Sequence, residues 1–491
     1  MRDDETGKLP GKKLRNRGFP LSTFTAPFVD PVQSQLAGRL AGLSITRQIA
    51  VLAIWPLLEQ TLNFLVTFVD TVQSGHLDAS AVAAVGIAGY IVWILGLIES
   101  AVGVGASAII ARATGARRPR LVHAALGQSL VMAAIAGVVV GATLFVLAEP
   151  ISVFVELSGR DLEYSTLFLR ILALANPMCF VLFVGCACYR GAGNTATPFW
   201  IMLVVNIVNV AANYTFVLGP EPLGGHGVAG IALATDVAWT FGALLMIISL
   251  LRGRSGLRLH LHRLALQRKM ATLILRISMP NLVEVSGIWA GQFLVLKIIG
   301  HVGRTGLPNA IALHSVAVRV EAMSYLPGFA ISAAAATLAG QYLGAGAPEH
   351  AKRAVRQCWY ICMVIMGAVG LLFVLAPSPL IGIVTNDPTI LREAPILLRI
   401  CGPSEIFMAT YLVLSQAMRG AGDTRAPMVL SYFSIFCVRL PAVYILGLVM
   451  DDKLVGIWFA LCGEVVFRGV IFALRFWQGS WLEAKVWSFT A

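Results

Sequence analysis

The stretch Arg190-Gly-Ala-Gly-Asn-Thr-Ala-Thr-Pro198 recurs as Arg419-Gly-Ala-Gly-Asp-Thr-Arg-Ala-Pro427. The arginine, both glycines, the threonine and the proline match at a constant separation of 229 residues. The same separation relates Gly115 to Gly344 and Arg170 to Arg399. A repeat at this spacing indicates that the chain consists of two similar halves.

The composition around this repeat is that of a membrane protein. Hydrophobic residues make up 57% of the chain and charged residues 13%, whereas a soluble domain carries roughly 25% charged residues. The apolar segments are long enough to cross a bilayer as helices, and the short alternating strands of a membrane β-barrel are not seen. We therefore predict an all-α membrane protein with twelve transmembrane helices, at residues 48–74, 81–111, 121–148, 162–188, 197–219, 226–251, 275–300, 309–338, 352–376, 389–417, 427–450 and 454–477.

The distribution of basic residues predicts the orientation of these helices. Arginine and lysine gather in the even-numbered joins, which are therefore expected to face the cytoplasm together with both termini. Both copies of the repeated motif lie in such joins, so the two halves share one orientation and form a parallel repeat. The loop cations explain the net charge of +12 without a nucleic-acid partner.

The domain organisation follows from the repeat. Two six-helix lobes at 47–251 and 275–477 are expected to flank a central cleft, the arrangement that alternating access requires. A basic cytoplasmic linker at 252–274 joins them, and polar cytoplasmic tails occupy 1–46 and 478–491. We expect the chain to function as a monomer in the lipid bilayer.

At these residues the sequence resembles the multidrug and toxic compound extrusion (MATE) transporters of the multidrug/oligosaccharidyl-lipid/polysaccharide exporter superfamily. The resemblance spans roughly residues 48–475 and rests on Val69-Asp70-Thr71, the paired Arg-Gly-Ala-Gly motifs, the asparagine-rich stretch 206–214, Gly227-Val-Ala-Gly230 and Arg439-Leu-Pro441. It implies export of amphipathic, often cationic, small molecules by antiport with H⁺ or Na⁺. The location implied is the plasma membrane, which is the inner membrane in a Gram-negative cell.

The resemblance does not identify the coupling ion. Some members of the family have an acidic residue where this chain has Met408, and some proton-coupled members have an aspartate in place of Asn213. No cofactor is expected beyond the coupling ion, H⁺ or Na⁺.

Charged residues inside the predicted spans differ between the lobes. The first lobe has the acids Glu59, Asp70, Glu99 and Asp236, with Arg170 as the one basic residue well inside a span. The second lobe mixes acids and bases, which we expect to pair. A carboxylate without a basic partner in a low-dielectric interior takes up a proton or holds a cation. The sequence therefore predicts a coupling site in the first lobe.

Five polar residues are candidates for that site because they fall in the outer half of spans 1, 5 and 6: Asp70, Asn209, Asn213, Thr235 and Asp236. Carboxylate, amide and hydroxyl oxygens suit an alkali cation and equally hydrogen-bond a protonated acid. The resemblance assigns Asp70, Asn209 and Thr235 to the cation or proton site, a possible Na⁺ site. The alternative role is a structural helix-end cap for Asp70, and hydrogen bonding between helices for Asn209, Asn213 and Thr235. Adjacent helical residues point about 100° apart, so Thr235 and Asp236 cannot both face one spot.

The substrate cleft is predicted less sharply. Glu59, Glu99 and Glu284 are candidate cleft acids, and Glu284 has Arg276 or Lys297 as alternative partners. Aromatic and methionine side chains that suit organic cations include Trp55, Tyr90 and Met323, although the same residues also serve in packing or face lipid.

Two structural expectations accompany these sites. Arg439 is expected to pair with Glu464, Glu405 or Glu321. The eight cysteines are expected to be buried small hydrophobes without a disulfide framework or metal spacing.

Two other functions are compatible with parts of this pattern. A lipid-linked oligosaccharide or precursor flippase would share the superfamily fold, but its pyrophosphate substrate favours a cationic cleft. An intramembrane enzyme would need a metal or nucleophile constellation, and the sequence has neither a Gly-x-Ser-x-Gly motif nor a Walker loop. We therefore expect a transporter and not an enzyme.

Overall fold

The computed structural model describes residues 38–75, 79–154, 157–220, 224–253, 256–305, 309–450 and 453–484, with Leu36 and Leu307. Of these residues, it gives the backbone alone at 63–75, 79–95, 218 and 305. Two groups of helices follow one another along the chain. The first lobe comprises α1 (Ile45–Gly75), α2 (Ala79–Gly115), α3 (Pro119–Phe154), α4 (Gly159–Gly191), α5 (Ala196–Asn213) and α6 (Gly227–Leu251). The second comprises α7 (Arg268–Thr305), α8 (Ala310–Gly344), α9 (Pro348–Leu375), α10 (Pro377–Gly382), α11 (Pro388–Glu393), α12 (Pro395–Cys401), α13 (Glu405–Ala421), α14 (Arg425–Phe433), α15 (Leu440–Tyr444) and α16 (Lys453–Gln478).

The all-α membrane architecture is confirmed. Within the described residues, eleven helices are long and apolar enough to cross a membrane. The 31-residue α1, described as backbone alone over its second half, occupies the place of the first predicted span. Large apolar side chains are exposed along these helices, for example Val146 and Leu174, each 70% exposed. Such surfaces are stable against lipid and not against water.

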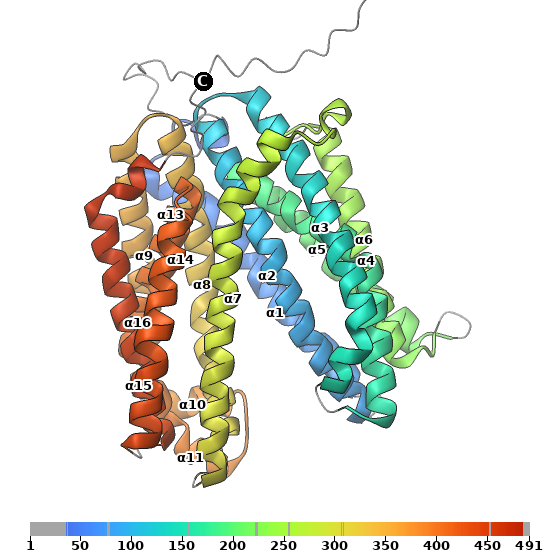
Figure 1. Cartoon of the computed structure of the whole chain (residues 1–491), viewed down its shortest axis with the longest axis vertical. Coiled ribbons are helices and arrows are strands. Elements are labelled where there is room, and N and C mark those ends of the chain that lie inside the picture. Colours follow the sequence, from blue (N-terminus) through green and yellow to red (C-terminus); the bar gives the residue numbers. More distant parts are fainter. Residues whose placement is uncertain are drawn as a thin grey trace, which may run out of the picture.

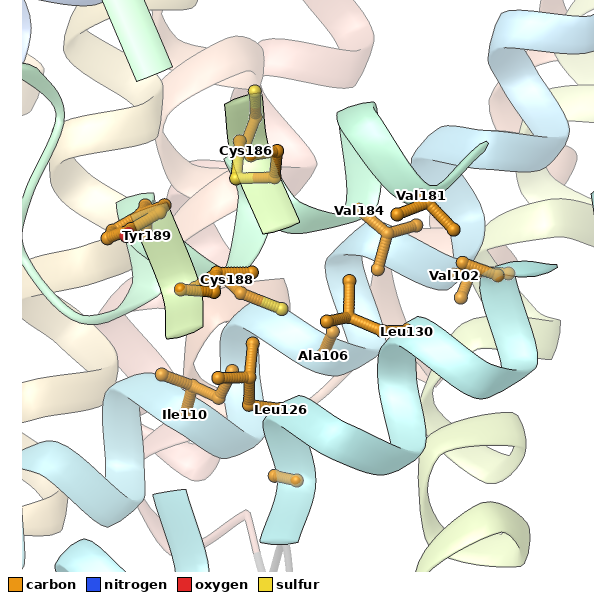
Figure 2. Close-up of a cluster of buried hydrophobic side chains, with 14 of the residues drawn as sticks. Val102, Ala106, Ile110, Leu126, Leu130, Val181, Val184, Cys186, Cys188 and Tyr189 are labelled. Carbon is orange, nitrogen blue, oxygen red and sulfur yellow. The ribbon is translucent and has the colours of Figure 1, made fainter. Parts of the chain in front are cut away.

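The core of the first lobe lies between α2, α3 and α4. Figure 2 shows Ala106 and Ile110 of α2 facing Leu126 and Leu130 of α3, with Val184 of α4 nearby. Small residues allow the helices to approach closely. A Cβ at Gly137 of α3 would lie 2.6 Å from a backbone atom of α4. This packing of small residues is typical of helices in membranes.

The tenth predicted span is broken, and prolines explain where. The prediction was one continuous segment at 389–417, whereas the structure has α11, α12, a short 3₁₀ turn at Gly402–Ser404, and α13. Pro395 starts α12 and Pro403 lies in the 3₁₀ turn. Proline has no amide hydrogen to donate and clashes with the preceding turn, so the helix is interrupted there. The break places Cys401 and Glu405 on either side of the turn.

The eleventh predicted span is likewise not a uniform α-helix. It runs through α14 and α15 with π-helical segments at Ser434–Arg439 and Ile445–Val449. In the first lobe, α5 likewise continues into a π-helical turn at Tyr214–Leu218. Such segments are frequent at functional sites.

The two lobes meet at one end and spread apart toward the other, as Figure 1 shows. The end at which they meet carries both repeated motifs and the ends of α2 and α8, and we call it the motif end. The opposite end carries α10 and α11. At the motif end, Leu36, Leu40, Ile49 and Leu52 join the buried core of the second lobe. The segment preceding α1 therefore packs across the lobe boundary.

Candidate functional site

The predicted coupling residues of α5 and α6 form one hydrogen-bonded group. Asn213 donates from Nδ2 to Asn209 Oδ1 at 3.2 Å, and Asn209 donates from Nδ2 to Thr235 Oγ1 at 3.5 Å. Asn213 is fully buried, and Asn209 is 6% exposed. Asn209 and Asn213 lie one helical turn apart, so α5 presents both amides to α6. The structure therefore gathers three oxygen-bearing side chains at one place in the first lobe.

Asp236 points to a different group. Its Oδ1 is buried without a hydrogen-bond partner among the described residues. Its carboxylate is close enough to Cys179 of α4 to interact electrostatically, and the Cys179 thiol donates to Glu99 Oε1 at 3.2 Å. Asp236 and Glu99 thus approach the same thiol, while the neighbouring Thr235 contacts α5. This division is the one that the 100° step between adjacent helical residues requires.

Two predicted site residues lie outside the described side chains. Asp70 falls in α1 and Tyr90 in α2, where the structure gives the backbone alone. Whether Asp70 completes the group formed by Asn209, Asn213 and Thr235 stays a prediction.

The predicted cleft acid Glu59 is engaged by the motif arginine of its own lobe. Arg190 Nη1 lies 3.1 Å from both carboxylate oxygens of Glu59. Glu59 is 5% exposed, so the ion pair is largely shielded from water. Its carboxylate therefore faces a guanidinium in this conformation.

Glu284 is engaged in the equivalent way in the second lobe. Arg419 Nη2 and Ser431 Oγ both donate to Glu284 Oε1 at 2.7 Å. The partner is thus Arg419 of the second motif, and neither of the two bases considered from the sequence, Arg276 and Lys297, forms the ion pair. Glu284 is fully buried, and its Oε2 has no hydrogen-bond partner among the described residues. In each lobe, the motif arginine therefore neutralises a glutamate from that lobe's first helix.

Arg439 was expected to pair with Glu464, Glu405 or Glu321, and the structure confirms Glu464 as its partner. Arg439 Nη2 and Nε donate to Glu464 Oε2 at 2.6 and 2.9 Å. Arg468 also pairs with Glu464, at 3.1 Å, and Ser434 donates to the same carboxylate. One buried carboxylate thus holds two guanidinium groups.

The chain is similar to known proteins over most of its length. The sequence matches the MatE family over residues 39–215 and 280–445, which together cover more than half of the chain. This chain belongs to the MatE family. The family consists of transporters, which confirms that the chain is not an enzyme.

Individual relatives match the MatE chain over nearly its whole length. It is 28% identical to a probable multidrug resistance protein NorM of Thermotoga maritima, over 90% of this chain and 94% of that protein. It is 27% identical to a probable multidrug resistance protein NorM of Idiomarina loihiensis, over 85% of this chain and 91% of that protein. These relatives are similar in sequence along both lobes and not in one module alone.

The fold is also shared with solved structures. A structure described as the outward-facing conformation of a multidrug resistance MATE family transporter matches with a TM-score of 0.83 at 20% identity, covering 90% of this chain and 98% of that one. A superfamily transporter from Pyrococcus furiosus, described as having a binding pocket of reversed polarity, matches with a TM-score of 0.82 at 19% identity, over 94% and 100% of the two chains. At these identities the likeness shows the MATE fold.

One group of ionisable side chains in this MatE protein was missed from the sequence. Glu321, Cys401 and Glu405 place their ligand atoms within 4.8 Å of one another, an arrangement able to hold a cation. Ser324 donates to Glu405 Oε2 at 2.8 Å, and Tyr325 donates to Glu321. We expected the acids of the second lobe to pair with its bases, which was wrong for these two within the described residues. Cys401 is accordingly more than a small hydrophobe.

A sequence signal for this group exists in retrospect. Cys401 and Glu405 are four residues apart, and Glu321 and Tyr325 are also four apart, so each pair shares a helix face. What the sequence did not reveal is that α8 presents its pair to the broken tenth span.

The predicted aromatic and methionine lining is only partly placed. The Trp55 ring packs at a tilt against Phe199 and Trp200 of α5, at ring-centroid distances of 5.2 and 6.1 Å. Met323 is 43% exposed. These contacts place Trp55 between α1 and α5, and a role in binding substrate stays a prediction for both residues.

Proposed function

We propose that this MATE protein exports amphipathic, cationic small molecules across the plasma membrane by antiport with H⁺ or Na⁺. The observation that carries the proposal is the Asn209–Asn213–Thr235 group. It lies in a lobe where the buried Glu99 and the half-buried Asp236 have no basic partner among the described residues. Oxygen ligands next to uncompensated carboxylates favour uptake of a small cation or a proton. Asp70, on the neighbouring first helix, is proposed as the charged member of the site.

The proposed cycle couples two states of the lobes. Drug binds while the cytoplasmic side is open, the lobes rock, and the ion binds in the first lobe from outside as the drug leaves. The ion can drive export only through its different affinity for the two states. One charge moved across 100 mV supplies ~2.3 kcal/mol, enough for about a 50-fold gradient.

The relatives support the substrate class. Several similar proteins carry the name multidrug resistance protein, and the solved MATE structures include one in complex with MaL6. An excess of acids in the first lobe suits organic cations.

The charge pattern disfavours the flippase alternative. A pyrophosphate head group needs free guanidinium groups, yet Arg419, Arg439 and Arg468 each contact a carboxylate. They are the three buried arginines of the described residues. These three guanidinium groups are therefore not free to bind an anionic lipid head group.

The test is export of a fluorescent cationic dye from proteoliposomes. A Na⁺ gradient and a pH gradient are imposed separately on the wild type, Asp70→Asn and Asn209→Ala. We expect one gradient to drive export, Asp70→Asn to abolish it, and Asn209→Ala to reduce its rate about ten-fold, the effect of losing one buried hydrogen bond to a bound ion.

Asn206→Ala is the matched control. Asn206 lies one turn before Asn209 on α5 and makes no hydrogen bond to Thr235 or Asn213 among the described contacts. It should retain wild-type export. Folded wild-type protein that moves no dye under either gradient, but scrambles a lipid-linked pyrophosphate, would overturn the proposal in favour of a flippase.

A further inference from the structure

The motif end contains hydrogen bonds that cross between the lobes in a symmetric way. Arg112 in the last turn of α2 donates from Nη2 to the carbonyl of Ala421 at 2.7 Å. Gln341 in the last turn of α8 donates from Nε2 to the carbonyl of Gly191 at 3.1 Å. Each donor belongs to one lobe and each acceptor to the other.

The internal repeat relates these two contacts. Arg112 and Gln341 are separated by 229 residues, which is also the separation of the two motifs. The acceptor Gly191 is the second residue of the first motif, and the acceptor Ala421 is the third residue of the second motif. The two acceptors therefore differ by one position within the repeated motif. Each lobe therefore extends its second helix to the motif helix of the other lobe.

The acceptors are carbonyl groups that need a donor. Gly191 is the last residue of α4 and Ala421 the last of α13, so neither carbonyl has a partner further along its own helix. A side chain from the opposite lobe supplies the missing hydrogen bond. If the lobes separated at this end, all of these groups would need to find water instead.

A second hydrogen bond reinforces each side. Arg112 Nη2 also donates to the carbonyl of Ala484, at 2.8 Å, in the turn that follows α16. On the other side, Thr337 of α8 donates to the carbonyl of Arg190 at 3.0 Å. The position equivalent to Thr337 in the first lobe is Ala108, which has no side-chain donor. Arg112 therefore makes two hydrogen bonds from the first lobe, and Gln341 and Thr337 make one each from the second lobe.

Glycines let the backbones of α2 and α8 touch where these donors lie. A Cβ at Gly115 would lie 1.9 Å from the carbonyl oxygen of Gln341, and a Cβ at Gly344 would lie 2.1 Å from that of Arg112. Gly115 and Gly344 are again 229 residues apart. The contact is thus reciprocal, and it is too close for any other residue type at either position.

We infer that Arg112, Gln341 and Thr337 form a latch that holds the motif end closed and sets how often the transporter opens there. They act as positioning residues for the transport cycle, since they contact helix ends and not the coupling group of α5 and α6. The inference rests on alternating access of the two lobes, as in the proposed function. It does not depend on the identity of the ion or the drug.

The latch is tested by measuring the opening of the motif end directly. Spin labels on cysteines introduced at the exposed positions Arg120 and Glu349, which are 229 residues apart, report the distance between the lobes in proteoliposomes, with Cys437, the exposed native cysteine, replaced by serine. Arg112→Ala and Gln341→Ala should each shift the ratio of long to short distances about ten-fold toward the open form, the change expected for losing a hydrogen bond to a buried or charged group.

Two threonines provide a matched pair that changes little else. Thr337→Val removes a hydrogen bond between lobes, whereas Thr410→Val removes one inside the second lobe, from Trp359 Nε1 at 2.8 Å. Both threonines are buried. The single hydroxyl hydrogen of Thr337 is shared between the carbonyl of Arg190 and that of Ala333 one turn earlier, and the hydroxyl of Thr410 donates to the carbonyl one turn earlier in its own helix. Thr337→Val should increase opening about three-fold, and Thr410→Val should not.

The outcomes are distinct. Unchanged distances in folded Arg112→Ala and Gln341→Ala, or equal effects of the two threonine substitutions, would overturn the latch. If either larger substitution prevents folding, the threonine pair still decides the question. Because no drug or gradient is needed, the latch can fail while dye export succeeds, and the reverse result is equally visible.

Discussion

The two lobes differ in how many of their buried charges form ion pairs, although the second lobe also holds two acids, Glu321 and Glu405, that lack a guanidinium in hydrogen-bonding contact among the described residues. In the first lobe, Glu99 accepts from the Cys179 thiol, neither Glu99 nor Asp236 has a guanidinium in contact among the described residues, and Glu59 is the buried acid that pairs with an arginine. In the second lobe, three arginines are held by Glu284 and Glu464. Lobes that share an ancestry visible in the repeat have therefore diverged in their interiors.

This difference shows that the number of buried acids does not locate a coupling site. An ion-paired carboxylate has its charge balanced already, so a cation gains little by binding there. A carboxylate without such a partner has either to be neutralised by a proton or to hold a cation. Substituting an ion-paired residue of the second lobe is therefore expected to lower the stability of the protein. Substituting a residue of the coupling group in the first lobe is expected to impair transport.

The largest effect is expected for Glu464→Gln. Arg439 and Arg468 would lose the one carboxylate that each contacts, and two guanidinium groups would stay buried without a counter-charge. Breaking a buried ion pair from one side costs about 3–5 kcal/mol. Thermal unfolding of the purified protein should reveal this loss.

The exposed pair Arg170–Glu149 supplies the control for that measurement. Its side chains are 42% and 60% exposed, and Glu149→Gln should change stability by about 0–1 kcal/mol. Equal unfolding temperatures for Glu464→Gln and Glu149→Gln would contradict the view that the second lobe is stabilised by its charges.

Arg419→Met is expected to have the next largest effect. It leaves Glu284 fully buried with Ser431 as its remaining described donor, at a cost of about 3 kcal/mol. Adding Glu284→Gln removes the unbalanced charge and should recover at least about 1 kcal/mol, because the interaction of the two sites is not additive. A double variant less stable than Arg419→Met alone would show that the pair is not the source of the loss.

Some features of the fold and of the candidate site could be predicted from the sequence, because they do not depend on how distant helices pack. Hydropathy predicted the helical spans, because it follows from local composition. The repeat at Arg190 and Arg419 predicted the two lobes, because it is visible when the two halves of the sequence are compared. The grouping of Asn209, Asn213 and Thr235 was also accessible, since two of the three are one turn apart on α5. Neither inference requires knowing how distant helices rotate about their axes.

Contacts between distant helices were not accessible in the same way. The partner of Glu284 is Arg419, 135 residues away, whereas the sequence offered the nearer Arg276 and Lys297. The approach of Glu321 to Cys401 and Glu405 depends on the proline break at 402–404, whose geometry a hydropathy pattern does not contain. Rotation of each helix about its own axis decides which of several bases an acid meets.

A smaller effect is expected for Thr235→Val in the first lobe. The substitution keeps the shape of the side chain and removes the hydroxyl that accepts from Asn209. Loss of one ligand or hydrogen bond should raise the ion concentration that half-activates dye export about ten-fold. Thr143→Val, on the exposed face of α3, is the matched control and should leave this concentration unchanged.

The smallest effect is expected for Glu405→Gln. Glu321 and Glu405 face one another around Cys401 without a guanidinium in hydrogen-bonding contact among the described residues, so at least one of them is more stable neutral than charged. The amide keeps an oxygen to accept from Ser324 and, like a protonated carboxyl group, carries no charge. Stability at neutral pH should therefore change by less than about 1 kcal/mol, and gradient-driven export should persist. A loss as large as that of Glu464→Gln would mean that Glu405 carries a balanced charge after all. A loss of export with stability intact would place a coupling group in the second lobe as well, and the contrast between the two lobes would no longer hold.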